Sequence, residues 1–177
     1  QNTSIGMSSL VDNTTGSYNT GLGYIALFEN STGASNTAVG NGALRNNTTG
    51  SLNNAFGKNA LFTNQTGGNN VAMGENALYY NTASNNTGLG HNALLANTTG
   101  TRNTGVGYGA IQSNTTGGRN TALGYAALQT YNVTDSGNSY NVAIGYSALS
   151  STTTGVSNLA VGGLALETNT TGQENVA

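Results

Sequence analysis

Large apolar residues recur along this chain about every 17 residues, and each stands in the same short sequence context. A typical repeat runs from Asn36 to Gly50 and begins Asn-Thr-Ala-Val-Gly. After two variable positions come Ala-Leu and then Asn-Thr-Thr-Gly, which is typical of a polar turn. Because the apolar positions lack a 3.6-residue period, the pattern favours short strands over helices. A fixed short period also predicts units that stack one on another along an axis.

Ten such repeats fill residues 1–177, so we expect a single repeat domain. They begin near Asn2, Asn19, Asn36, Asn53, Asn70, Asn86, Asn103, Asn120, Asn141 and Asn158, and a truncated copy begins at Asn175. The incomplete last copy suggests a fragment of a longer chain. The copy at Asn70 is one residue short, and the copy at Asn120 has about four extra residues within 130–140. Such an insertion is either a loop on a binding face or neutral drift at a tolerant turn.

Aligning the repeats turns each position into a column of side chains. We expect the two large apolar columns to fill the interior, and the tiny residue before the first of them to press against another surface. The core residues predicted in this way are Val39, Leu44, Leu61, Leu94, Leu123, Leu128, Ile144 and Leu149. The Gly after the first apolar column indicates a bend or a positive φ.

Asparagine forms a further column, which opens every repeat. Stacked Asn side chains can form a hydrogen-bonded ladder, although Asn also simply tolerates turn conformations. The predicted ladder includes Asn36, Asn53, Asn70, Asn103, Asn120 and Asn141. The turns also contain Asn-x-Thr triplets, which are either glycosylation sites or a product of turn preference. The candidate acceptors are Asn13, Asn47, Asn97, Asn114 and Asn169.

These columns predict an all-β fold, a parallel β-solenoid or β-roll with one 17-residue repeat per coil. Each coil would contain a strand, a Gly bend, a second strand and a polar turn, with a short Ala-Leu helical turn as the alternative to the second strand. Each repeat supplies few large apolar side chains for the number of residues that it must order. We therefore expect a homotrimer, intertwined or side by side, in which the tiny-residue column forms the close interface.

Composition narrows the possible functions. Charged residues are 6% of the chain, the formal net charge is −2 and there are four basic residues, so a nucleic-acid partner is not expected. No apolar run approaches the ~20 residues that span a bilayer, so we expect no membrane insertion. Without cysteine there is no disulfide framework or thiolate metal site. We expect no cofactor and no bound metal.

Catalytic chemistry also finds little support, and we expect no enzyme activity. His91 is the single histidine, and no catalytic triad or metal cluster can be built on it. Lys58, Glu75 and His91 share one column on successive coils, where a ladder of compensating charges is expected. Asp12 and Glu29 share another column, and solvated surface charge is the favoured interpretation there.

Tyrosines are the best candidates for ligand contact. Tyr108, Tyr125 and Tyr146 occupy one column in three consecutive repeats, and Tyr131 and Tyr140 flank the insertion. An exposed aromatic column is a plausible contact for glycan or for lateral fibre packing. The alternative is that these rings merely cover a thin roll.

The unit in residues 36–50 and 120–128 resembles the repeats of trimeric phage-type tail fibres and surface fibres. Its Asn-x-Ala-Ile-Gly core, at residues 141–145, is similar to the left-handed parallel β-roll of trimeric autotransporter adhesin heads. The resemblance covers essentially the whole chain, although adhesin-head repeats are usually a few residues shorter. It implies a trimeric, extracellular, adhesive or receptor-engaging fibre.

The favoured function is therefore a structural shaft or adhesin segment of a fibre on a cell or virion surface. Its expected partners are further copies of itself and a cell-surface glycan or receptor. The alternative is an extracellular filament or matrix subunit that stacks end to end. An ice-binding solenoid is a weaker candidate, because paired threonines such as Thr48 and Thr49 lie in turns and point in different directions.

Overall fold

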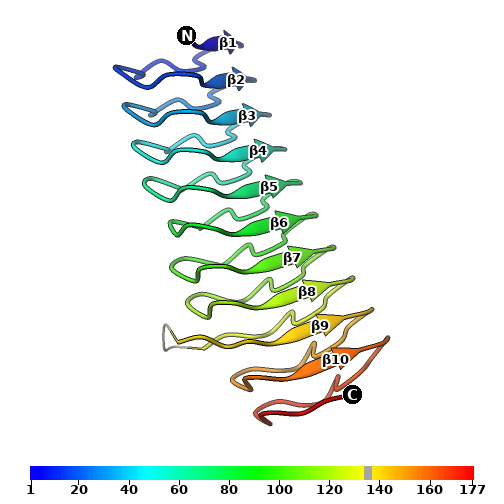
Figure 1. Ribbon diagram of the computed structural model, residues 1–177. Coiled ribbons are helices and arrows are strands. Elements are labelled where there is room, and N and C mark those ends of the chain that lie inside the picture. Colours follow the sequence, from blue (N-terminus) through cyan, green and yellow to red (C-terminus); the bar gives the residue numbers. More distant parts are fainter. Residues whose placement is uncertain (134–136) are drawn as a thin grey trace.

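The computed structural model describes residues 1–133 and 137–177, and it shows an all-β parallel solenoid with one strand per coil (Figure 1). Part of the insertion predicted within 130–140 therefore lies outside the described residues. The strands are β1 (Thr3–Ile5), β2 (Thr20–Leu22), β3 (Thr37–Val39), β4 (Asn54–Phe56), β5 (Val71–Met73), β6 (Thr87–Leu89), β7 (Thr104–Val106), β8 (Thr121–Leu123), β9 (Val142–Ile144) and β10 (Leu159–Val161).

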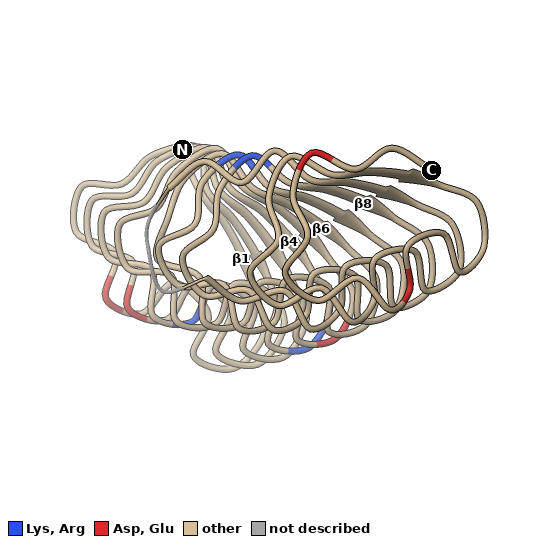
Figure 2. Cartoon of the chain, turned by 90° about the horizontal axis from the view of Figure 1, so that it is seen from below, with Lys and Arg blue, Asp and Glu red and all other residues tan. Residues whose placement is uncertain are grey.

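The ten strands form one parallel sheet in which each strand pairs with the next in chain order. Equivalent repeat positions face each other, as Thr20 faces Thr37 in the pairing of β2 with β3. Seen along the rod, the coils lie over one another as flattened loops (Figure 2). The one-repeat-per-coil prediction is thereby confirmed, and at about 4.8 Å per strand the sheet is roughly 50 Å long.

The interior contains the tiny residues, not the first apolar column. Ala38, the middle residue of β3, is fully buried, whereas its neighbour Val39 is only partly buried. Gly88 shows why the middle residue must be small: a Cβ there would lie 3.2 Å from Leu78 Cγ on the opposite wall. A bulky residue such as Phe therefore does not fit at this inward position of the strand.

This arrangement corrects part of the predicted core. Val39, Leu123 and Ile144 face outward, because they follow the inward-pointing tiny residue in an alternating strand. It also removes the tiny column as a chain–chain interface, since the chain's own interior covers it. The second apolar column was predicted correctly, and its five predicted members are fully buried: Leu44, Leu61, Leu94, Leu128 and Leu149.

The Ala-Leu segment is neither the predicted second strand nor a helical turn. It is a run of tight turns, in which Ala43 N donates to Gly40 O at 3.4 Å and Arg45 N donates to Gly42 O at 3.2 Å. The third residue of each turn has a positive φ, 68° at Gly42 and 50° at Leu44, as type II turns require. Hydrogen bonds to the next coil, such as Leu44 N to Ala60 O at 2.9 Å, hold these turns in register.

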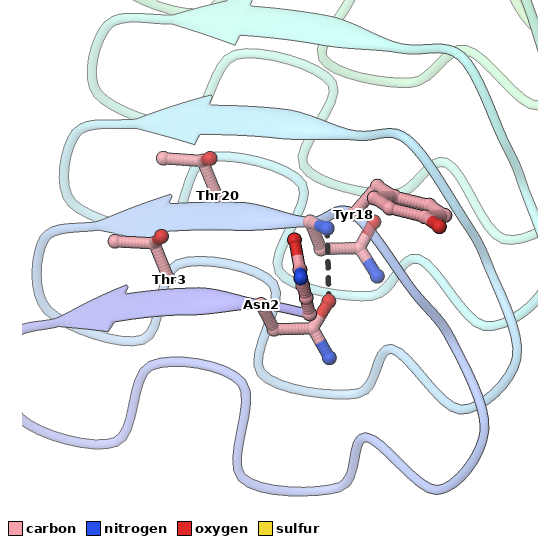
Figure 3. A pocket seen from close by; sticks show the side chains of 6 residues that line it. Asn2, Thr3, Tyr18 and Thr20 are labelled. Atoms are coloured by element: carbon pink, nitrogen blue, oxygen red, sulfur yellow. Dashed lines mark hydrogen bonds between the residues drawn. The ribbon is translucent and has the colours of Figure 1, made fainter.

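The opening asparagines form the predicted ladder. The Asn19 backbone N–H donates to Asn2 Oδ1 at 2.9 Å (Figure 3). The same bond recurs from the Asn36 N–H to Asn19 Oδ1 at 2.9 Å. The side-chain amide donates in turn to a glycine carbonyl, as Asn36 Nδ2 does to Gly50 O at 2.8 Å. The ladder continues through the predicted members Asn53, Asn70, Asn103, Asn120 and Asn141.

A second ladder runs through the first Asn of the turns. Asn47 Nδ2 donates to Asn30 Oδ1 at 2.7 Å, and Asn114 Nδ2 donates to Asn97 Oδ1 at 2.8 Å. Asn47, Asn97 and Asn114 are fully buried, so an N-linked glycan on their amides is incompatible with this fold. The prediction of glycosylation is therefore wrong at these three positions. Asn13 and Asn169, at the two ends of the same column, are only partly buried, and for them it stays a prediction.

Candidate functional site

The outer strand face is a surface that follows the whole ten-stranded sheet. We define it as the first and third residues of β1 to β10, which point away from the interior. The third residues form an apolar column with considerable exposure, for example 48% at Leu123 and 56% at Val161. The members of this outer apolar column are Ile5, Leu22, Val39, Phe56, Met73, Leu89, Val106, Leu123, Ile144 and Val161.

Threonines line much of the same face, and they were not among the predicted site residues. The first strand residue is Thr in β1, β2, β3, β6, β7 and β8. Their shared position directly after the opening Asn of the repeat was a signal in the sequence. The face is uneven in the middle, because β4 and β5 carry Asn54 with Phe56 and Val71 with Met73. Such bulky, irregular side chains do not suit the flat surface expected of an ice-binding protein.

Three of the five candidate tyrosines stack along one corner of the rod, just beyond the bend glycine. The ring centroids are 5.1 Å apart between Tyr108 and Tyr125 and 5.4 Å apart between Tyr125 and Tyr146, with nearly parallel planes. His91 extends this stack, with its ring 5.3 Å from Tyr108. Each inner ring is therefore covered on both faces, and mainly its edge remains open to a ligand.

The same corner carries the predicted charge ladder. Lys58 Nζ lies 3.1 Å from Glu75 Oε1, and His91 Nδ1 lies 4.0 Å from Glu75 Oε2. The predicted mutual compensation between coils is confirmed. These groups are substantially exposed, so the pairs contribute little to stability.

The other two tyrosines lie elsewhere. Tyr131 is fully buried and occupies the position that Asn holds in the second ladder of regular coils. Burial raises the pKa of its hydroxyl, and the neighbouring Ser139 hydroxyl lowers it by a smaller amount. A buried ring cannot contact a ligand, so the prediction for Tyr131 was wrong. Tyr140 is exposed beside Arg119, which donates a hydrogen bond to its hydroxyl and lies 5.5 Å from its ring centroid.

A second stacked column, on the wall opposite the sheet, was not foreseen. The Arg45 guanidinium lies between the rings of Phe28 and Phe62, at 5.7 and 5.5 Å from their centroids. The Phe62 ring stacks on Tyr79 at 5.1 Å. These residues all follow the buried leucine of their repeat directly, and that shared position was a signal in the sequence. Arg45 also lies 3.7 Å from Glu29, which therefore has a partner other than Asp12.

Hollows and ionisable clusters offer little chemistry. One hollow, with a volume of about 260 Å³, lies beside the first two coils and is lined by their residues (Figure 3). Its lining residues are Gln1, Asn2, Thr3, Tyr18, Asn19 and Thr20, none of them acidic or basic. Charged residues lie at several separate places around the coils (Figure 2). Across residues 1–133 and 137–177, no three His, Cys, Asp or Glu side chains gather where a metal could bind.

Comparison with known proteins identifies no family for the chain. No protein-family profile, curated protein or solved structure matches it. In the described part of the chain, no helix has the length and apolar character needed to cross a membrane.

Proposed function

We propose that this chain is a shaft segment of an extracellular or virion-surface fibre, and that it assembles as a parallel homotrimer through the outer strand face. The observation that carries the proposal is the outer apolar column, which runs through all ten strands on the side away from the interior. Extended apolar surfaces of this kind mark interaction sites in soluble proteins.

The periodicity of this face favours another copy of the chain as the partner. One large apolar side chain appears on every coil, at the spacing of adjacent strands. A partner that matches the whole length of the column must have the same repeat along its axis. A parallel copy meets that requirement, and the likeness of the repeat to those of trimeric fibres favours three chains.

An attachment role accompanies the shaft. Charged residues are only 6% of the chain, and Asn, Thr and Gly are abundant in the repeat, which suits an exposed rod. The aromatic corner and Tyr140 lie on the outside of the coils, where a cell-surface glycan or receptor can reach them. We propose these as the contact regions.

Sedimentation velocity on the 17.8 kDa chain tests the assembly directly. We expect a species of three chains, and the double variant Val106→Ser with Leu123→Ser should shift it toward the monomer. The matched control is Val11→Ser, a residue 56% exposed on the opposite wall, which should leave the trimer intact. A folded wild-type monomer throughout the micromolar range would overturn the homotrimer.

End-to-end assembly into a filament is the second candidate, favoured by the even register of the sheet, in which each described strand pairs with the next in chain order. Copies stacked in the same register would continue this parallel pairing from one chain to the next. This mode predicts sizes that grow with concentration without a limit at three chains, and fibres in electron micrographs. Such a result, unaffected by the double variant, would favour the filament over the trimer.

A further inference from the structure

Two further columns of side chains border the outer strand face. We define the start flank as the residue two positions before each strand, and the end flank as the residue two positions after it. Arg102 and Tyr108 border β7 in this way, and Arg119 and Tyr125 border β8. Further described coils lie on both sides of these two coils, so the exposure of the four side chains is that of the continuous rod. Arg102, Tyr108 and Tyr125 are exposed, and Arg119 is half-buried.

The residue types on the two flanks change together along the chain. The end flank carries Tyr in the coils of β2, β7, β8 and β9, and in those same coils the start flank carries Arg or Tyr. In the coils of the other strands the start flank carries neither of these residues. The matched pairs are Tyr18 with Tyr24, Arg102 with Tyr108, Arg119 with Tyr125, and Tyr140 with Tyr146. A match that recurs coil by coil indicates that the two side chains of a pair contact one another.

The two members of a pair do not meet within one chain. The strand between them has three residues and is about 10 Å long. Each flank packs along its own column instead: Tyr108 stacks on Tyr125 at 5.1 Å, and Arg119 donates a hydrogen bond to the Tyr140 hydroxyl. Among the described residues, the Arg102 side chain has no hydrogen-bond, ion-pair or cation–π partner. A single chain therefore leaves the match across the strand unused.

Local conformation does not explain the arginines either. The start flank has a positive φ, 59° at Arg102 and 62° at Arg119. Asn and Gly adopt this conformation most readily, and Asn85 occupies it one coil earlier. Two guanidinium groups on adjacent coils, about 4.8 Å apart along the rod, also repel each other. A partner that accepts hydrogen bonds from both of them would offset this repulsion.

A second copy of the chain supplies such a partner. When parallel copies surround a common axis with their outer strand faces toward it, the start flank of one chain meets the end flank of the next. Copies at the same height place Arg102 beside Tyr108 of the next chain. The stacked rings then present their edges and hydroxyls to the guanidinium groups. The contact of Arg119 with the Tyr140 hydroxyl shows the same pair of groups already bonded within the chain.

We propose that Arg102 and Arg119 donate hydrogen bonds to the hydroxyls of Tyr108 and Tyr125 of the next chain, which holds the copies parallel and at the same height. The inference rests on the proposed assembly through the outer strand face, and it specifies the contacting residues and the register.

The distant pair of Tyr18 and Tyr24 fixes the register more sharply. A shift by one coil would place Tyr18 opposite Met7 or Asn41 of the next chain, so every pair is matched only without a shift. The aromatic corner of one chain and Tyr140 of the next then lie along one seam, which joins the two regions proposed for attachment.

Cross-linking tests the contact, because the chain has no cysteine of its own. Arg102→Cys and Tyr108→Cys are placed in separate chains, one of them with a size tag, and the chains are refolded together and treated with a short bismaleimide. We expect a cross-linked pair with one chain of each kind, and no cross-link when either variant is treated alone. The matched control is Ser35→Cys, on the start flank four coils earlier and about 19 Å away, which should not link to Tyr108→Cys.

Sedimentation of a second variant tests the hydrogen bonds. Tyr108→Phe with Tyr125→Phe removes the two hydroxyls and keeps the stacked rings, so association should weaken about tenfold. Tyr79→Phe, in the stacked column on the opposite wall, should leave association unchanged.

The contrary outcomes are distinct. Cross-linked pairs from Arg102→Cys alone, or equal linking by Ser35→Cys, would overturn the proposed register, and full association of the double Phe variant would overturn the hydrogen bonds. Three chains in sedimentation without the expected cross-link would overturn this inference alone. A wild-type monomer would overturn the proposed assembly as well.

Discussion

The second and third residues of each strand are neighbours in sequence, but they lie on opposite sides of the coil wall. The inward column contains only Ala and Gly from β2 to β10, with Ser4 in β1. The outward column contains Val, Leu, Ile, Phe and Met. The difference shows that the interior limits the volume of the side chain, whereas the outer apolar column requires only that the side chain be apolar. A column of uniform size therefore marks the inside of this rod better than a column of uniform hydrophobicity.

Truncating a buried leucine and an outward one should separate the two sides most strongly. Leu44→Ala removes a fully buried side chain and should cost about 2–5 kcal/mol of unfolding free energy. Leu123→Ala, on the outer strand face, should act through association instead. Urea unfolding at a series of protein concentrations measures both effects.

The two shifts should respond differently to dilution. The shift for Leu44→Ala should be the same at every concentration, whereas the shift for Leu123→Ala should diminish as the chain is diluted. A concentration-independent loss of several kcal/mol in Leu123→Ala would show that the outer column stabilises the single chain, contrary to the comparison.

Enlarging the same two columns should give a smaller contrast. Ala38→Phe forces a ring into an interior only one small residue wide, and overpacking of this kind costs about 1–3 kcal/mol. Val39→Phe places the same ring outside, in a column that already contains Phe56. Thermal unfolding should show a lower Tm for Ala38→Phe and little change for Val39→Phe, and equal losses would contradict the assignment of the two faces.

The two faces of the strand are also the feature of the fold that was predicted wrongly from the sequence. The period, the parallel register, the Asn ladder and the buried leucine column could be predicted, because each follows from residues that recur at one position. Which residues of each strand point inward could not be predicted, because alternation alone allows two arrangements that differ by a shift of one residue. The decisive fact is the approach of Leu78 to Gly88 across the interior, which depends on how the turns fold back.

The candidate site likewise has features that could be predicted from the sequence and features that could not. The shared column of Tyr108, Tyr125 and Tyr146 was readable from the repeat, and so was the charge ladder beside it. The burial of Tyr131 was not, because its equivalence to a ladder asparagine depends on how the irregular coil aligns with regular ones. The turn conformation was also missed, since positive φ values at buried leucines run against the usual preference of that residue.

Outward positions tolerate a large β-branched side chain without strain only where φ is negative, and Ile25, which has a positive φ, tests this condition. It has a φ of 51°, a left-handed conformation that is unfavourable for a β-branched residue, and its equivalents Asn59, Asn76 and Asn92 suit it better. Ile25→Asn should raise the unfolding free energy by about 1 kcal/mol, and the reciprocal Asn59→Ile should lower it by a similar amount. Chemical unfolding of the two variants measures both signs. Because Ile25 is only partly buried, the relief of backbone strain in Ile25→Asn should outweigh the loss of packing. Destabilisation by Ile25→Asn would instead mean that the apolar contacts of Ile25 contribute more to stability than the strain costs.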